Sequence, residues 1–194
     1  AAIMRAACDV QAETGEAPKV EIMIPLVGFE EELRIVRSEV VDVAETVLRE
    51  RGATLEYTVG TMIELPRACV MAGEISHHAD FFSFGPNDLT QTTLGFSRDD
   101  AETKFLKHYL DQGVLPFTPF ESVDRAGVGG LVKMAVASAR QEKPGIKLGV
   151  CGEHGGDPDS VVFFHGAGLD YVSCSPFRVQ TARIAAARAA LGAE

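Results

Sequence analysis

The chain has 194 residues, of which 46% are hydrophobic, enough to bury the core of one globular domain spanning residues 1–194. Its formal charge of −10 argues against a non-specific nucleic-acid binder, because phosphate backbones are bound through clusters of Lys and Arg. The four cysteines are widely spaced, and no apolar run approaches the roughly 20 residues that span a bilayer. We therefore expect a cytoplasmic protein without a disulfide framework, a structural zinc site or a membrane segment.

The first segment, residues 1–13, has the composition of a helix. It begins with Ala rather than Met, and no capping residue precedes it. We therefore expect this chain to be a piece of a longer protein, and a piece can carry half of an active site.

Five short runs rich in β-branched and aromatic residues are typical of strands. Most of these runs are continuously apolar rather than alternating, as parallel strands buried on both faces require. In chain order, the predicted strands cover residues 19–27, 56–65, 80–89, 146–153 and 170–177.

Helical segments alternate with these strands. The clearest covers residues 29–51, where apolar residues recur at helical spacing and three glutamates at positions 30–32 suit the positive end of a helix dipole. Further helices are predicted at residues 66–78, at 101–110 within a longer excursion after Leu94, at 124–143, from Asp157 and from Ser175.

Alternating strands and helices leave two architectures, a doubly wound open sheet and a (β/α) barrel. Polar residues at the carboxyl ends of successive predicted strands favour the barrel, which builds its site from several strands at once. These residues are Glu64, Asn87, Asp88, Cys151 and Ser173. Because a barrel needs eight strands, we predict an α/β fold of the (β/α)8 TIM type, of which this chain is a C-terminal fragment with about five βα units.

Glu64 and Asp88 are the candidate metal ligands, because Mg²⁺ takes one or two carboxylates together with substrate oxygens and water. For Glu64 the alternative is neutralisation of Arg67 or a helix end, and for Asp88 it is a turn or cap role. Their positions at adjacent strand ends favour the metal hypothesis over both alternatives.

Cys151 is the candidate proton-transfer group. A thiol between Val150 and Gly152 is often an inert buried side chain, but the EHGGDP turn that follows can tune its pKa. Near the last strand, Ser175 and Arg178 either face an anion at a helix start or serve as ordinary helix-capping residues.

Four motifs then carry a resemblance to a known family: GTMIELPRA, FFSFGPNDLTQTTLGFSRDDAE, GVCGEHGGDPDSV and GLDYVSCSPFRV. Together they resemble the C-terminal substrate domain of the pyruvate, phosphate dikinases, a branch of the phosphoenolpyruvate-utilising enzymes. The resemblance covers almost the whole chain. Phosphoenolpyruvate synthase and enzyme I of the sugar phosphotransferase system share the NDLTQ core but differ around the Cys turn and SCSPFR.

This resemblance implies a phosphoenolpyruvate/pyruvate-binding barrel that exchanges a phosphoryl group with a phosphohistidine on a separate domain of the full-length, ATP-binding enzyme. It implies Mg²⁺ bound by Glu64 and Asp88, and substrate contacts from Glu64, Gly85, Pro86, Asn87 and Asp88. Cys151 matches the acid/base that exchanges a proton with the methyl or methylene carbon. A homodimer is also expected.

Two departures from the family pattern matter. Pro86 stands where the family has Thr or Ser, so one backbone donor and one hydroxyl are absent. The family's substrate-clamping arginines lie on earlier strands that no segment here matches. We therefore expect the isolated chain to lack the full dikinase reaction.

Two other functions fit the same residues. A Mg²⁺-dependent pyruvate aldolase or lyase uses the same metal and enolate logic on a barrel. A non-catalytic module that dimerises the parent protein is the alternative outside enzymology.

Overall fold

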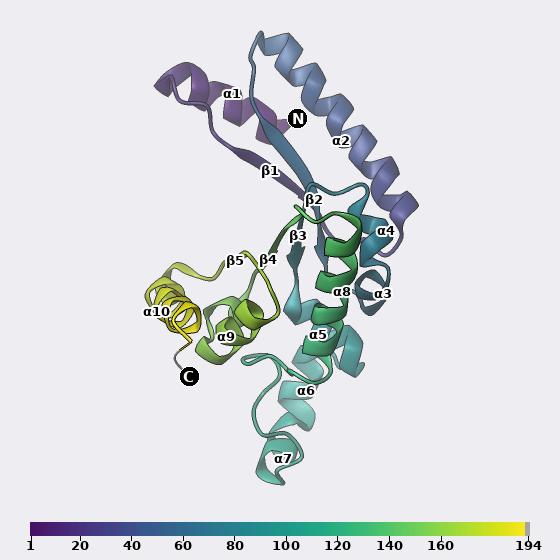
Figure 1. Cartoon of the computed structure of the whole chain (residues 1–194), viewed down its shortest axis with the longest axis vertical. Helices are drawn as coiled ribbons and strands as arrows, with labels where there is room; N and C mark the ends of the chain where they lie inside the picture. Colours follow the sequence, from purple (N-terminus) through teal and green to yellow (C-terminus); the bar gives the residue numbers. More distant parts are fainter. Residues whose placement is uncertain (193–194) are drawn as a thin grey trace.

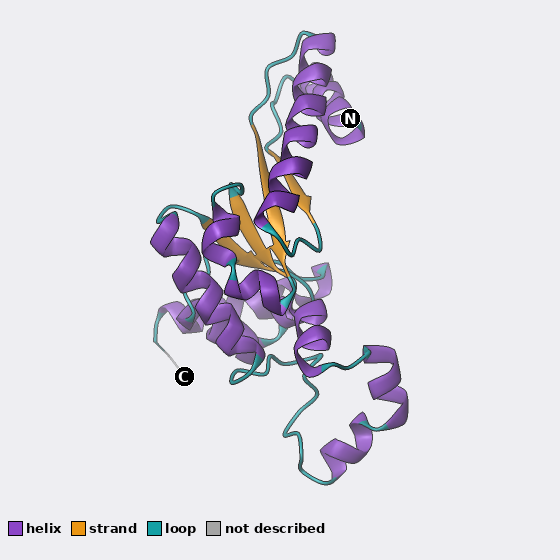
Figure 2. Ribbon diagram, turned by 90° about the vertical axis from the view of Figure 1, so that its right-hand side faces the viewer, coloured by secondary structure: helices purple, strands orange, loops and turns teal. Residues whose placement is uncertain are grey.

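The computed structural model describes residues 1–192, in which helices alternate with the strands of one sheet (Figures 1 and 2). Each strand begins one residue after its predicted start, which confirms the α/β class. They are β1 (Val20–Ile24), β2 (Tyr57–Ile63), β3 (Phe81–Phe84), β4 (Lys147–Val150) and β5 (Tyr171–Val172).

The sheet is entirely parallel, and its strands lie in chain order, β1-β2-β3-β4-β5. Each crossover therefore returns to the neighbouring position, as in a segment of a barrel wall. Within the described residues β1 and β5 are the two edges, so the sheet is open. The parallel sheet is confirmed, and closure into a barrel stays a prediction.

The helices vary from single turns to the six-turn α2. Several of them pack on one another across a face of the sheet, notably α3 and α4 against α8, and α9 against α10. The helices are α1 (Ala2–Thr14), α2 (Glu30–Arg51), α3 (Pro66–Val70), α4 (Ala72–Ser76), α5 (Pro86–Leu94), α6 (Arg98–Lys104), α7 (Leu106–Asp111), α8 (Val128–Glu142), α9 (Pro158–Gly166) and α10 (Val179–Ala190), with the 3-10 turns η1 (Glu153–Gly156) and η2 (Pro176–Arg178).

Helix α2 follows the sequence signals closely. The Glu32 carboxylate accepts hydrogen bonds from the N–H groups of Gly28 (2.9 Å) and Phe29 (3.3 Å), which satisfies donors that a helix start leaves free. Gly52 ends the helix in the left-handed conformation, with φ 60°.

The main core lies between β2, β3 and β4 and the helices α3, α4, α8 and α9. Its largest fully buried members include Ile63, Phe82, Phe84 and Leu148, so the strands that lead to the predicted site are the most deeply buried part of the chain. Among the described residues, no helix is both long and apolar enough to cross a membrane.

Two parts project from this body in opposite directions (Figure 1). Helices α1 and α2 pack on each other beside the start of β1 and β2, over a cluster that includes Met4 and Leu48. At the other end, α6 and α7 form the excursion, residues 95–127, which has a small core of its own around Ala101, Leu106 and Phe120.

Several predicted boundaries were wrong: the strand 146–153 ends at Val150, and the helix 101–110 is two helices, α6 and α7. The predicted strand 80–89 ends at Phe84, because Gly85 leaves the sheet and Pro86 opens α5 at the position where a missing N–H costs nothing. The predicted strand 170–177 keeps only two residues, since Pro176 begins a 3-10 turn. The predicted helix 66–78 is split at Met71 into α3 and α4.

Candidate functional site

Residues at the carboxyl ends of four strands lie in one row across the sheet. In the register, Ile63 pairs with Phe84, Phe84 with Val150, and Val150 with Val172. The next residue of each strand segment therefore follows a paired position. These next residues are Glu64, Gly85, Cys151 and Ser173.

Glu64 is held in this row by the backbone of a neighbouring loop. Its side chain is buried, with the residue only 4% exposed, and Oε1 accepts a 2.8 Å hydrogen bond from the N–H of Leu26. Leu26 is the one residue other than Gly with a positive φ (55°) in the described part of the chain. A left-handed Leu is strained, and here the strain accompanies a donor directed at the candidate ligand.

Electrostatics link Glu64 to Asp88. Burial raises the pKa of the Glu64 carboxyl; the hydrogen bond from Leu26 lowers it, and the Asp88 carboxylate raises it again through its charge and a hydrogen bond between the two side chains. Two neighbouring carboxylates, one buried and one half-buried, favour either a proton or a cation between them.

Gly85 leaves room for the Glu64 side chain. A Cβ atom at Gly85 would lie 2.6 Å from Glu64 Oε2 and 2.9 Å from Glu64 Cβ, so no other residue fits without displacing the carboxylate. Asp88 then lies in the first turn of α5, where Oδ1 accepts a 3.2 Å hydrogen bond from Gln91 Nε2. Residues 85–88, which the sequence analysis placed at the end of the strand 80–89, are thus a helix start.

Pro86 and Asn87 complete that first turn. Pro86 is buried at the first helical position, so the helix loses no hydrogen bond through its missing donor. Asn87 Oδ1 is buried without a hydrogen-bond partner among the described residues, and its amide Nδ2 faces Gly152. A buried amide oxygen without a donor suits a ligand that supplies one.

Cys151 lies two strands from Glu64. Its backbone N–H donates to the Phe84 carbonyl at 3.1 Å, and Sγ is 3.5 Å from the same oxygen and 3.9 Å from Met62 Sδ. Burial raises the pKa of the Cys151 thiol, a hydrogen bond with Ser83 lowers it, and the charges of Glu64 and Asp88 raise it further. The thiol is therefore protonated near neutral pH and within the field of both carboxylates.

A pocket of about 580 Å³ opens beside this row. Three residues that the sequence analysis proposed as possible ligand contacts line it, Asn87, Ser175 and Arg178. Cys174 is half-buried and also lines the pocket. The remaining lining residues are Arg98, Glu121, Gly152, Glu153 and Asp157.

Protein atoms supply only some of the ligands that Mg²⁺ needs. No group of three or more His, Cys, Asp or Glu side chains that could hold a metal lies among residues 1–192. The neighbouring carboxylates of Glu64 and Asp88 are hard oxygen donors, and Mg²⁺ commonly takes one or two such ligands with water and substrate oxygens in the other positions. The residues present therefore fit this ion with a substrate as co-ligand.

Comparison with known proteins agrees with this arrangement. Residues 1–191 match the family described as the phosphoenolpyruvate-binding domain of phosphoenolpyruvate-utilising enzymes. The chain belongs to this family. The resemblance that the four motifs indicated is thereby confirmed.

Among the curated members of this family, the pyruvate, phosphate dikinase of Clostridium symbiosum is 57% identical over 190 residues, which cover 98% of this chain and 22% of the relative. The chloroplastic pyruvate, phosphate dikinase of Flaveria trinervia is 61% identical over 168 residues, covering 87% of this chain and 18% of the relative. This family member thus spans about a fifth of the length of the relatives it matches.

Solved structures show the fold at low identity. A citrate lyase from Burkholderia xenovorans LB400 aligns with a TM-score of 0.57 and 14% identity, over 94% of this chain and 53% of its own. The citrate lyase β subunit of M. tuberculosis, solved with oxaloacetate and magnesium, aligns with a TM-score of 0.51 and 17% identity, over 92% of this chain and 66% of its own.

Proposed function

We propose that this chain is the C-terminal part of the phosphoenolpyruvate/pyruvate-binding barrel of a pyruvate, phosphate dikinase. The observation that carries the proposal is the row of strand ends, which brings Glu64, Gly85 and Cys151 to neighbouring positions in a chain 57–61% identical to dikinases. The full-length enzyme would convert pyruvate, ATP and phosphate to phosphoenolpyruvate, AMP and diphosphate.

Glu64 and Asp88 would hold Mg²⁺. When bound, the ion supplies Lewis-acid stabilisation of the negative charge that develops on the substrate oxygens. The Glu64 carboxylate is preorganised, because the Leu26 N–H binds one of its oxygens and the absent side chain of Gly85 leaves room for the other. Asn87 would orient the substrate through its amide.

Cys151 would move the proton at carbon. Toward phosphoenolpyruvate, its thiolate takes a proton from the pyruvate methyl group, and the resulting enolate oxygen attacks the phosphorus of the phosphohistidine, whose imidazole leaves. In the reverse direction, the thiol donates its proton to the methylene carbon. The raised pKa of Cys151 suits the thiol for this reverse, proton-donating role.

The partners follow from the same proposal. Pyruvate or phosphoenolpyruvate occupies the strand ends, and a phosphohistidine domain of the same full-length chain delivers the phosphoryl group. A homodimer and a cytoplasmic location stay predictions, and the curated relatives include chloroplastic dikinases. The lyase alternative gains nothing from the citrate lyases, which share the fold at 14% and 17% identity.

A Cys151→Ala variant of the full-length protein tests the proposal. Exchange of pyruvate methyl protons with solvent should fall by about 10² to 10⁴ fold, the usual contribution of a general acid/base, while phosphorylation of the protein by ATP persists. Cys8→Ala, a buried cysteine change in α1, is the matched control and should exchange like the wild type. Methyl exchange that survives in Cys151→Ala would contradict the proposal.

A further inference from the structure

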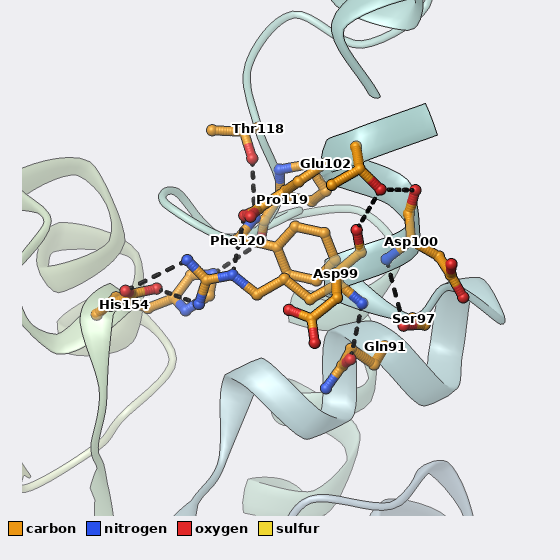
Figure 3. A network of polar contacts seen from close by, with 12 residues as sticks. Gln91, Ser97, Asp99, Asp100, Glu102, Thr118, Pro119, Phe120 and His154 are labelled. Atoms are coloured by element: carbon orange, nitrogen blue, oxygen red, sulfur yellow. Dashed lines mark hydrogen bonds and ion pairs between the residues drawn. The ribbon is translucent and has the colours of Figure 1, made fainter. Parts of the chain in front are cut away.

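One arginine of the excursion contacts the turn that follows Cys151, residues 152–157, which we call the Cys151 turn. Arg98, the first residue of α6, donates from Nη1 to Glu153 Oε2 at 2.8 Å and from Nη2 to Glu153 Oε1 at 3.3 Å. Its Nε donates to Glu102 Oε1 at 2.9 Å, and the guanidinium lies 5.5 Å from the centroid of the Phe120 ring. Figure 3 shows the network to which these contacts belong.

This geometry distinguishes Arg98 from an ordinary surface ion pair. A single exposed pair contributes little, because two long side chains must be ordered in water. Here each nitrogen of the guanidinium donates a hydrogen bond. Nε donates to Glu102 in the same helix, and Nη1 and Nη2 donate to the two oxygens of Glu153, while the Phe120 ring lies nearby. A planar fork with both ends fixed is an orienting contact.

The other end of the chain of contacts is Asp88. The backbone N–H of Arg98 donates to Gln91 Oε1 at 2.8 Å, and Gln91 Nε2 donates to Asp88 Oδ1 at 3.2 Å. One residue therefore has its backbone linked to the candidate metal ligand and its side chain linked to the turn that carries the thiol. No other residue named at the site makes both connections.

The Cys151 turn needs such an external contact. Strand β4 fixes Cys151 itself through the Phe84 carbonyl, but Gly152 follows with φ 84° and ψ −162°, a conformation open essentially to Gly alone. Gly is also the residue that ordering costs most entropy. Beyond this point the excursion supplies three contacts to the turn: Arg98 to Glu153, the Pro119 carbonyl to His154 Nε2 at 2.8 Å, and Ser122 Oγ to Asp157 Oδ2 at 2.8 Å.

We propose that Arg98 is a positioning residue that sets the place of the Cys151 turn relative to Asp88. The inference rests on the proposed function, since it concerns the same proton transfer. Arg98 touches neither reacting atom and acts through Glu153 on one side and Gln91 on the other. Its loss displaces the thiol from the methyl carbon. Glu64 keeps its hydrogen bond from the Leu26 N–H, and Asp88 keeps its hydrogen bond from Gln91, because the Arg98 contact with Gln91 is made by the backbone.

The test separates proton transfer from binding in the full-length protein. Arg98→Gln should slow pyruvate methyl exchange at saturating pyruvate by about tenfold to a hundredfold, because displacements near 1 Å have effects of this size. The dissociation constant of pyruvate in Mg²⁺ should change by less than about twofold, since Glu64 and Asp88 are not moved. Arg98→Lys should recover part of the exchange rate, because its ammonium group keeps the charge but not the planar geometry of the guanidinium group.

Two further variants complete the design. Glu153→Gln should reproduce the effect of Arg98→Gln, and the double variant should be no slower than either, because both changes remove one contact. Arg125→Gln is the matched control, an exposed arginine paired with Asp159 outside the network, and should exchange like the wild type. Exchange at the wild-type rate in Arg98→Gln, or equal losses of exchange and pyruvate affinity, would overturn the proposal.

Amide hydrogen exchange separates this inference from the proposed function. Without any substrate, residues 152–156 should exchange faster in Arg98→Gln than in the wild type and in Arg125→Gln. A wild type without Cys151-dependent methyl exchange would contradict the proposed function. Unchanged amide exchange in Arg98→Gln would contradict the role of Arg98 whatever the wild type does.

Discussion

The strand ends and the excursion, residues 95–127, both contribute polar side chains beside one pocket, but different forces hold them. At the strand ends, Glu64 is almost fully buried and bound by a backbone N–H, and Gly85 leaves only the space that its carboxylate fills. Arg98 of the excursion is part-exposed, and it contacts the exposed Glu153 of η1 through side chains alone.

The difference separates two tasks. A group fixed by a backbone N–H keeps its geometry when a neighbouring side chain changes, which suits Glu64 as a ligand that must point at one cation. Side-chain contacts across separate segments are adjustable, which suits the setting of one turn against another. Substitutions that act on the backbone should therefore have larger effects than substitutions that act on the excursion.

Gly85→Ala should have the largest effect on the strand ends. The added Cβ would overlap Glu64, so we expect a loss of up to about 3 kcal/mol in the free energy of unfolding, the usual scale of overpacking, and loss of Mg²⁺-dependent pyruvate binding. Thermal unfolding and calorimetric titration of the full-length protein check both. Gly145→Ala, where a Cβ would meet open space, is the control; equal behaviour of the two variants would show that the clearance at Gly85 is irrelevant.

Gly152→Ala tests the residue that links the strand end at Cys151 to the turn contacted by the excursion. Its φ of 84° with ψ −162° strains any side chain, so we expect a cost of about 2 kcal/mol and slow methyl exchange with pyruvate binding retained. Gly130→Ala, in open space within α8, should instead stabilise the protein by roughly 0.5 to 1 kcal/mol. Normal methyl exchange in Gly152→Ala would show that the turn does not need this conformation.

The smallest expected effect concerns the buried contact of the excursion, His154. Burial lowers the pKa of His154 below its ordinary value of 6.5, although the hydrogen bond to the Pro119 carbonyl and the nearby carboxylates raise it. Because the folded protein disfavours the charged imidazole, the stability that neutral His154 contributes is complete above pH 6.5. It is lost as the pH falls through the lowered pKa of the folded state, by about 1.4 kcal/mol per unit of difference between the two pKa values.

Amide hydrogen exchange of residues 118–123 and 153–157 between pH 7 and 5, corrected for the intrinsic rates, measures this effect. Protection should fall on acidification in the wild type and change less in His154→Phe, which has no titrating ring. The same pH dependence in both proteins would assign the effect to other groups.

Much of the strand-end region could be predicted from the sequence. Continuous apolar runs that stop at Glu64, before Gly85 and at Cys151 indicate buried parallel strands, and the carboxyl ends of such strands meet at one edge. What the pattern missed there is local: Asn87 and Asp88 lie in the first turn of a helix, because Pro86 can start one as easily as a turn.

The excursion could not be predicted in the same way. Arg98 and Glu153 are separated by 55 positions, and their contact depends on the direction in which the segment after α5 leaves the body. The excursion also has its own core of Phe120, Ala101 and Leu106, a cluster that has no regular period in the sequence. Closure of the sheet into a barrel stays a prediction, since β1 and β5 are edges within residues 1–192.

The most direct measurement is a double-mutant cycle on Mg²⁺-dependent pyruvate binding in the full-length protein. Glu64→Gln and Asp88→Asn each remove one carboxylate with little change in shape. If both carboxylates hold one ion, either change alone should abolish the Mg²⁺ dependence, and the double variant should bind pyruvate no more weakly than the weaker single variant. Losses that add in the double variant would mean that the two side chains act separately, and would contradict a shared magnesium site.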